Sequence, residues 1–393
     1  MIKTLFVCHE GQRTGAPLLL LWLIRWLKSH TSIQPVVALM RDGPLKAEFS
    51  DLCPTYTFER PGLERWHRRL RRKLLPGPPL DPDTWLAALV AREQPDCLYL
   101  NTLVLGGLLG PVALDPQRMR VISHAHEMEI GLQLSSNRSD VERQLAASDV
   151  VIACAGAVRD NLINNYQLPP ERCTLITEYI PYTEPQQLLE LICNDNPSQA
   201  VIETMHQHRN AGEFLFGMAG SAIDRKGFDL FPLLLRACER QFGEVPFRGV
   251  WVGCGPGSLS HTKAERDLNL LGLRHRALLL PGVSCGAAAL RQLDVLALLS
   301  REDPYPVVAL EAGAMGIPTV CFRHSGGIAE LAEAGCGVAV DYLDLDAFAA
   351  ALYRLQQDQA ERQRLGEAFR SRVFAGNTVA TQAPRIAALI EGR

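Results

Sequence analysis

The sequence predicts an α/β protein with two Rossmann-like, doubly wound domains that face each other across a cleft. Short runs rich in Val, Ile and Leu alternate with longer segments of helical period, and this alternation occurs twice. Such alternation is typical of parallel sheets covered by helices on both faces. The chain has 393 residues, 47% of them hydrophobic, which is too long for one compact core. Ligands of such folds bind at the carboxyl ends of the strands.

The strands are predicted in two sets of six, one for each domain. In the first domain, residues 1–185, they are 4–8, 35–40, 97–101, 120–126, 150–155 and 173–180. In the second, residues 186–375, they are 214–220, 248–253, 276–282, 295–300, 318–322 and 337–341. We expect a polar connection with some helix over 184–212. Residues 376–393 are expected to form a C-terminal helix that packs back on the first domain.

Composition and charge exclude several classes of protein. The run APLLLLWLI is shorter than the roughly 20 residues that span a bilayer, so it predicts a buried helix, neither a signal peptide nor an anchor. The 11 cysteines form no Cys-x-x-C pair, which indicates reduced thiols in a cytoplasmic protein without a zinc or iron-sulfur site. A net charge of -3 gives no reason to expect nucleic acid.

The stretch SREDPYPVVALEAGAMGIPTV, residues 300–320, places Asp303 and Glu311 eight residues apart across a loop that becomes a helix. Pro304 and Pro306 suit a loop and a first helical turn. The amino end of that helix offers amide hydrogens and partial positive charge to an anion. The two carboxylates suit the hydroxyls of a sugar and a ribose. Alternatively, Asp303 caps the helix and Glu311 is a surface charge.

This stretch resembles the acidic motif of the retaining GT-B glycosyltransferases of family 4, also called glycosyl transferases group 1. In that motif two Glu eight residues apart contact the hexose and the ribose of the donor. The resemblance implies that Asp303, one methylene shorter than Glu, contacts the hexose and that Glu311 contacts the ribose. The donor site would also include Pro304, Tyr305, Pro306 and Val307.

Two further segments of the second half are similar to motifs of this family. In GMAGSAIDRKGFDLF, residues 217–231, Arg225 and Lys226 would hold the donor diphosphate. Many members carry an Arg six residues before the Lys, where this chain has Gly220. In FRHSGGIAEL, residues 322–331, Gly326 and Gly327 would let the backbone approach the donor. Each segment could also be an ordinary turn.

Two segments of the first half complete the resemblance. CHEGQRTGAPLLL, residues 8–20, resembles the opening loop, so Gly15 is expected near the donor phosphates and Gly11 on the acceptor side. In VISHAHEMEIGL, residues 121–132, His124 and His126 end a strand and point the same way.

A His followed by an acid, here His126 and Glu127, lies near the transferred sugar in this family, so His126 is the first choice and His124 the second. The two histidines could instead be a structural pair, or a metal site that lacks a third ligand. Asn101, after the strand CLYL, is an acceptor-side candidate that could also be a cap.

The resemblance implies a retaining, metal-independent transferase without a cofactor. It would move a hexose from a nucleotide-diphosphate sugar to a hydroxyl of a glycan, lipid-linked or small-molecule acceptor. The expected catalytic residues are His126, Arg225, Lys226 and Asp303. The Asp-x-Asp segments at 81–83 and 344–346 precede helical patterns and are expected to be caps. The alternatives are a sugar-nucleotide epimerase of the same fold and a non-catalytic sugar-nucleotide-binding assembly protein.

The segment LERWHRRLRRKLLPG, residues 63–77, combines Leu63, Trp66, Leu70 and Leu74 at helical spacing with basic residues between them. It predicts peripheral contact with the inner face of a membrane. A solvated helix, or a clamp for a phosphorylated soluble acceptor, would show the same pattern.

Overall fold

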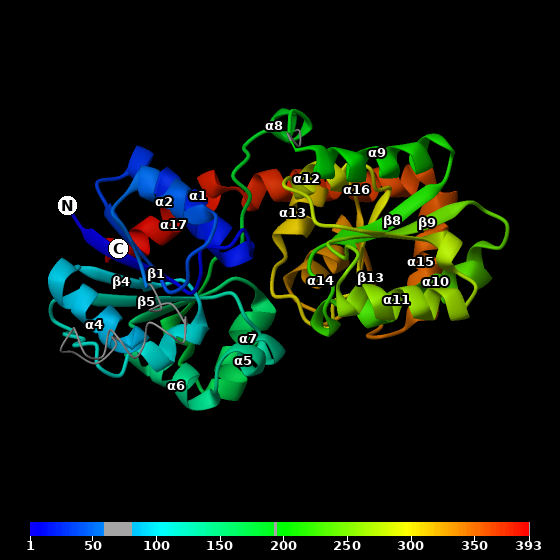
Figure 1. Cartoon of the computed structure of the whole chain (residues 1–393). Helices are drawn as coiled ribbons and strands as arrows, with labels where there is room; N and C mark the ends of the chain where they lie inside the picture. Colours follow the sequence, from blue (N-terminus) through cyan, green and yellow to red (C-terminus); the bar gives the residue numbers. More distant parts are fainter. Residues whose placement is uncertain (59–80, 192–194, 393) are drawn as a thin grey trace, which may run out of the picture. The chain divides into compact units, whose positions relative to one another are not determined.

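A computed structural model describes residues 1–58, 81–191 and 195–392 of the chain (Figure 1). The predicted amphipathic segment 63–77 lies outside these residues. Contacts divide the chain into two compact units. Unit 1 comprises Met1–Cys154, Val158–Ile176 and Ala383–Arg393, and unit 2 comprises Ala155–Ala157 and Thr177–Gln382. Within the described ranges, no helix combines the length and the apolar character needed to cross a membrane.

Unit 1 is built on a seven-stranded parallel sheet with the order β3-β2-β1-β4-β5-β6-β7. Its strands are β1 Lys3–Cys8, β2 Gln34–Leu39, β3 Thr55–Thr57, β4 Cys97–Leu100, β5 Arg120–Ala125, β6 Val150–Ala153 and β7 Cys173–Leu175. The strand order reverses between β1 and β4, which is where open α/β sheets bind ligands.

Helices cover both faces of the unit 1 sheet. They are α1 Gly15–His30, α2 Leu45–Leu52, α4 Pro82–Glu93, α5 Glu129–Ser135, α6 Arg138–Ala147 and α7 Gly156–Tyr166, with the 3-10 turns η1 Leu103–Leu108 and η2 Pro170–Arg172. Figure 1 shows α1 and α2 on one face and α4 and α6 on the other. The apolar run near the start of the chain lies in α1 and buries leucines against the sheet. The last helix, α17 Val379–Ile390, contributes its residues from Ala383 onward to unit 1.

Unit 2 is built on a six-stranded parallel sheet with the order β10-β9-β8-β11-β12-β13. Its strands are β8 Phe214–Ala219, β9 Phe247–Val252, β10 Ala277–Leu280, β11 Val295–Leu298, β12 Thr319–Phe322 and β13 Gly337–Val340. Here the strand order reverses between β8 and β11. The predicted fold class, two Rossmann-like parallel α/β domains, is confirmed.

Helices surround the unit 2 sheet, and several begin directly after a strand loop. They are α8 Pro185–Leu189, α9 Asn196–Asn210, α10 Phe231–Phe242, α11 Leu259–Leu270, α12 Gly286–Leu290, α13 Val307–Ala314, α14 Gly327–Leu331, α15 Leu345–Gln357 and α16 Gln359–Gly376. Short turns lie at η3 Asp224–Lys226, η4 Phe228–Leu230, η5 Arg274–Arg276 and η6 Ala332–Cys336.

Three details differ from the predicted elements. Strand β3 was not predicted, because its Thr-Tyr-Thr sequence is half-buried and lacks an apolar run. The predicted strand 173–180 ends at Leu175, and the chain passes into unit 2 at Thr177. The predicted connection 184–212 consists largely of helix, since α9 is capped by Asp195 and buries Val201 and Met205.

Candidate active site

Three loops come together at the carboxyl ends of β8, β11 and β12, which are neighbouring strands of unit 2. Hydrogen bonds between main-chain groups join them. Arg301 N donates to Arg225 O at 2.9 Å, Asp303 N to Ser325 O at 2.7 Å, and Gly327 N to Pro304 O at 2.8 Å. The structure thus brings the Arg-Lys-Gly, acidic and Gly-Gly segments into one site.

The two basic side chains of this site share one carboxylate. Lys226 Nζ lies 2.5 Å from Asp303 Oδ2, and Arg225 Nη1 lies 3.9 Å from Asp303 Oδ1. Arg225 Nη1 also donates to Glu302 O at 2.7 Å. Two cations therefore lie beside the carboxylate of Asp303, and both can form charge-assisted hydrogen bonds with an anion.

A glycine and a second ion pair fix the loop that carries these cations. Gly227 has φ +74°, and a Cβ there would lie 2.0 Å from Leu299 O, so only glycine fits. Arg301 donates both guanidinium nitrogens to Asp229, at 2.7 and 2.8 Å. The same guanidinium donates to Asp224 O at 2.7 Å. This bidentate contact ties the β11 loop to the loop after β8.

Asp303 is largely buried and already has partners in the chain. Besides Lys226, Ser300 Oγ donates to its Oδ2 at 3.2 Å. The residue at the cap position of α13 is Pro306, so the alternative that Asp303 caps this helix is wrong. A hexose contact would have to share the carboxylate with Lys226.

Glu311 lies in α13, partly shielded from solvent, and is no ordinary surface charge. Burial raises its pKa to about 7. The pKa of Tyr182 is raised by burial, then by the charge of Glu311 and then by Cys285. Glu311 Oε2 lies 3.7 Å from where a Cβ on Gly286 would be. Glu311 therefore faces a neighbourhood formed by Tyr182 and the start of α12.

The residues between Asp303 and Glu311 have different structural roles. Tyr305 is buried, and its hydroxyl accepts a hydrogen bond from Asn377 Nδ2 at 3.1 Å. Its ring therefore packs within unit 2. Pro304 supplies the carbonyl that Gly327 contacts, and Val307 begins α13, whose first amides have no acceptor within the helix.

The Gly-Gly loop is required by packing against the acidic loop. Gly326 has φ +141°, and a Cβ there would lie 1.9 Å from Asp303 O. A Cβ on Gly327 would lie 2.3 Å from the Tyr305 ring. Gly220 has φ +153°, and its carbonyl accepts from Trp251 Nε1 at 3.0 Å, which anchors the loop after β8 to the core.

In unit 1, polar residues follow β1, β4 and β5 on either side of the reversal in strand order. Glu127 accepts from the Thr102 hydroxyl, from Leu103 N at 3.2 Å and from His126 N at 3.1 Å. It therefore fixes the exits of β4 and β5. Asn101 Nδ2 donates to Ala16 O at 2.9 Å, so this side chain holds the start of α1.

The two histidines after β5 differ in their surroundings. His124 is fully buried, with its Nδ1 2.7 Å from the Tyr99 hydroxyl, and its pKa lies well below the usual value because of burial and then of His126. The two rings lie 4.1 Å apart between centroids, and His126 is the more exposed. His126 is therefore the better placed to meet a ligand of unit 1.

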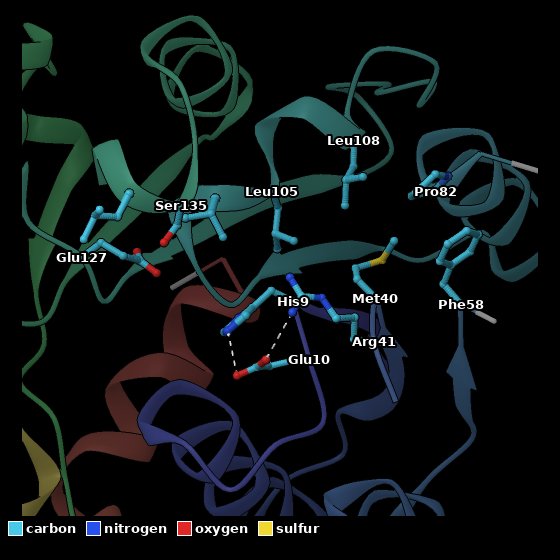
Figure 2. A pocket seen from close by; sticks show the side chains of 12 residues that line it. His9, Glu10, Met40, Arg41, Phe58, Pro82, Leu105, Leu108, Glu127 and Ser135 are labelled. Carbon is cyan, nitrogen blue, oxygen red and sulfur yellow. Dashed lines mark ion pairs between the residues drawn. The ribbon is translucent and has the colours of Figure 1, made fainter. Parts of the chain in front are cut away.

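A pocket of about 560 Å³ opens beside these residues (Figure 2). His9, Glu10, Arg41 and Glu127 line it together with apolar side chains. His9 Nε2 lies 3.5 Å from Glu10 Oε1, and Arg41 Nη1 lies 4.0 Å from Glu10 Oε2. Burial lowers the pKa of His9, although Glu127 and Glu10 oppose this.

Sequence reasoning missed His9, Glu10 and Arg41. The signal was present, because each lies within two residues of the end of β1 or β2, at the edge where ligands bind. The two predicted glycines nearby differ. Gly11 packs closely against Gly43, whereas a Cβ on Gly15 would meet open space at the start of α1.

Comparisons with known proteins agree with this fold. Residues 213–358 match the family described as glycosyl transferases group 1, and residues 34–180 match Glycosyltransferase Family 4. The paired parallel sheets and strand-end loops are those of a GT-B protein. The chain belongs to the family 4, or group 1, glycosyltransferases, as the sequence motifs predicted.

Curated relatives share part of their length with this chain. The D-inositol 3-phosphate glycosyltransferase of Corynebacterium diphtheriae is 26% identical over 270 residues, covering 66% of this chain and 60% of the relative. The enzyme of the same name from Xylanimonas cellulosilytica is 29% identical over 239 residues, covering 58% and 54%. The matches thus span less than two thirds of these relatives.

Among solved structures, Anabaena HepE in complex with UDP and glucose has a TM-score of 0.77 and 18% identity. The match covers 100% of both chains. This likeness establishes the fold.

The raised pKa of Glu311 predicts how stability depends on pH. The carboxyl titrates near 4.5 when unperturbed and near 7 in the folded chain, so the folded state binds more protons between these values. Its contribution to stability is full below about pH 4.5 and is lost as pH rises through 7. In urea unfolding, Glu311→Gln should gain on the order of 3 kcal/mol over the wild type between about pH 4.5 and 8.

The matched control is Glu367→Gln, on the exposed surface of α16. Its unfolding free energy should run parallel to that of the wild type across the same pH range. A parallel curve for Glu311→Gln as well would show that the Glu311 carboxyl is not desolvated.

Proposed function

We propose that this protein is a retaining, metal-independent glycosyltransferase that moves a hexose from a UDP-sugar to an acceptor hydroxyl. The observation that carries the proposal is the cluster of Arg225, Lys226 and Asp303 at the strand reversal of unit 2. Family membership supports the reaction class. The UDP and UDP-glucose complexes of HepE support the choice of nucleotide and sugar.

In this proposal the cations act on the leaving group. As the bond between sugar and phosphate breaks, negative charge develops on the diphosphate, and Arg225 and Lys226 stabilise it. The ion pair with Asp303 holds Lys226 in position before the donor arrives, so little reorganisation is needed. The first amides of α13, near Val307, add partial positive charge.

The remaining residues bind and orient the two substrates. Glu311 accepts hydrogen bonds from the ribose hydroxyls, and Asp303 shares its carboxylate between Lys226 and the hexose. Gly326 and Gly327 bring main chain close to the donor. His126 lies near the transferred sugar and Glu127 fixes its loop. The acceptor hydroxyl attacks on the face that the diphosphate leaves, and its proton passes to a phosphate oxygen.

Two other functions predict different outcomes for the purified protein with UDP-glucose. An epimerase would convert the sugar nucleotide into an isomer without releasing UDP. A non-catalytic assembly protein would bind the sugar nucleotide and leave it unchanged. Release of UDP, with or without an added acceptor, distinguishes the proposed transferase from both.

The diphosphate assignment predicts how binding divides between nucleotide and nucleoside. Arg225→Ala and Lys226→Met should each weaken UDP binding by about tenfold or more, because charge-assisted hydrogen bonds to phosphate are lost. Binding of uridine should change little. Isothermal titration calorimetry with both ligands measures the difference.

Arg240→Ala is the control, since Arg240 is an exposed arginine of α10 that pairs with Asp346. This variant should bind UDP as the wild type does. Equal losses of UDP and uridine affinity in the Arg225 and Lys226 variants would place these residues away from the diphosphate.

The reaction itself predicts a second result. UDP release from UDP-glucose should persist in excess EDTA, because protein cations neutralise the leaving group.

Glu311→Ala should reduce the rate of UDP release by at least about a hundredfold, because the donor is no longer positioned. A coupled assay for UDP measures both. Activity that EDTA abolishes and magnesium restores would overturn the metal-free mechanism, and an active Glu311→Ala enzyme would overturn the donor site.

A further inference from the structure

We propose that the pocket of unit 1 binds an amphiphilic acceptor, with a neutral hydroxylated head beside His9 and Glu127 and an apolar chain along Met40, Leu105 and Leu108. The inference rests on the proposed function, because it names the acceptor of that transferase. It goes further by specifying the chemistry of a molecule that family membership leaves open.

The pocket has two chemically different ends. Figure 2 shows Glu127 and Ser135 at one side, His9, Glu10 and Arg41 at the centre, and Leu108, Phe58 and Pro82 toward the other side. The apolar side chains that line it are Met40, Phe58, Val104, Leu105, Leu108 and Leu134. A purely hydroxylated ligand would leave the apolar side unused, whereas an amphiphile matches both.

The apolar wall is a rigid part of the unit. Met40, Phe58 and Leu105 belong to one buried core cluster, against which Leu108 packs. An apolar chain in the pocket would therefore meet fixed side chains, and its burial is favourable in proportion to the area removed from water. The volume of about 560 Å³ lies within the range of about 300–1,000 Å³ usual for small-molecule pockets.

A separate exposed leucine lines the pocket on its Glu127 side. Leu134 of α5 lines the pocket, yet 71% of it is exposed, and Ile130 of the same helix is also exposed. Two large exposed apolar side chains one helical turn apart are a surface that an apolar chain could cover. Leu134 directly precedes Ser135, which lies on the Glu127 side of the pocket in Figure 2, so an apolar chain along Leu108 would lead away from Leu134.

The polar end favours a neutral head over a phosphorylated one. His9 Nδ1 is buried and has no hydrogen-bond partner in the described part of the chain. The lowered pKa of His9 keeps the imidazole neutral near pH 7, so it can exchange a hydrogen bond with a hydroxyl. Among the described side chains that line the pocket, Glu10 and Glu127 outnumber the one positive charge of Arg41. These two carboxylates would repel an anionic head.

The test uses the full chain and a series of butyl, hexyl and octyl β-D-glucopyranosides, each below its micelle concentration. Affinity measured by calorimetry should rise by about fourfold for each methylene that becomes buried. Affinity that does not change with chain length would overturn the proposal. Tighter binding of glucose 1-phosphate than of butyl glucoside would overturn the neutral head.

Variants separate the two ends of the pocket. Leu108→Gln should reduce the gain from butyl to octyl, because Leu108 lies along the path of the chain, and Leu134→Gln, on the Glu127 side, should leave this gain unchanged. The matched control is Leu259→Gln on α11 of unit 2, where 70% of the leucine is exposed. His9→Ala should weaken all three ligands by the same factor. Equal effects of Leu108→Gln and Leu259→Gln would contradict the assigned path of the chain.

Two further arms locate the acceptor and isolate the inference. Phosphatidylcholine vesicles are prepared with and without octadecyl β-D-glucopyranoside. If the acceptor is an amphiphile embedded in a bilayer, only the vesicles that contain the glucolipid retain the protein. If the acceptor is a free amphiphile, neither kind of vesicle retains the protein. UDP binding is measured on the same samples. UDP binding without a chain-length dependence defeats this inference and leaves the proposed function standing. Glucoside affinity that rises with chain length, in a protein that does not bind UDP, supports the amphiphile pocket and defeats the proposed function.

Discussion

The ion pair between Lys226 and Asp303 is the contact on which the proposed donor site depends. It joins the loops after β8 and β11, and only 16% of the lysine side chain and 7% of the aspartate side chain are exposed. Two charges so far removed from water must satisfy each other, because either one alone would be costly to bury. Ser300 and Arg225 also contact this carboxylate and help to compensate its buried charge.

The rest of the site follows from that pairing. The main chain of Asp303 reaches Ser325, which places the Gly-Gly loop, and Arg301 reaches Arg225 and Asp229, which places the cations. Three loops pack so closely at this sheet edge that Gly227 and Gly326 have no room for a Cβ atom. The proposed anion site is therefore organised before any ligand binds. Unit 1 contrasts with it, since its pocket combines a neutral imidazole and carboxylates with an apolar wall.

Much of this could be predicted from the sequence, because parallel strands buried on both faces appear as continuous apolar runs. The predicted site residues each follow such a run: Arg225, Lys226, Asp303 and the Gly-Gly pair. Because neighbouring parallel strands end at the same edge of a sheet, this position was enough to predict that they lie close together. The polar edge strand β3 carries no such signal. Sequence patterns also could not show the hydrogen bond between Tyr305 and Asn377 or the ion pair between Lys226 and Asp303. Each contact joins residues that are over 70 positions apart in the sequence.

The central claim is that Asp303 acts on the diphosphate of the donor through Lys226. A double-mutant cycle on UDP affinity, with Asp303→Asn and Lys226→Met singly and together, tests it most directly. The account predicts that Asp303→Asn weakens binding in the wild type but causes no loss when Lys226 is already Met, a coupling of about 0.5–3 kcal/mol. The same loss in both backgrounds would mean that the two residues act independently, and would contradict the account.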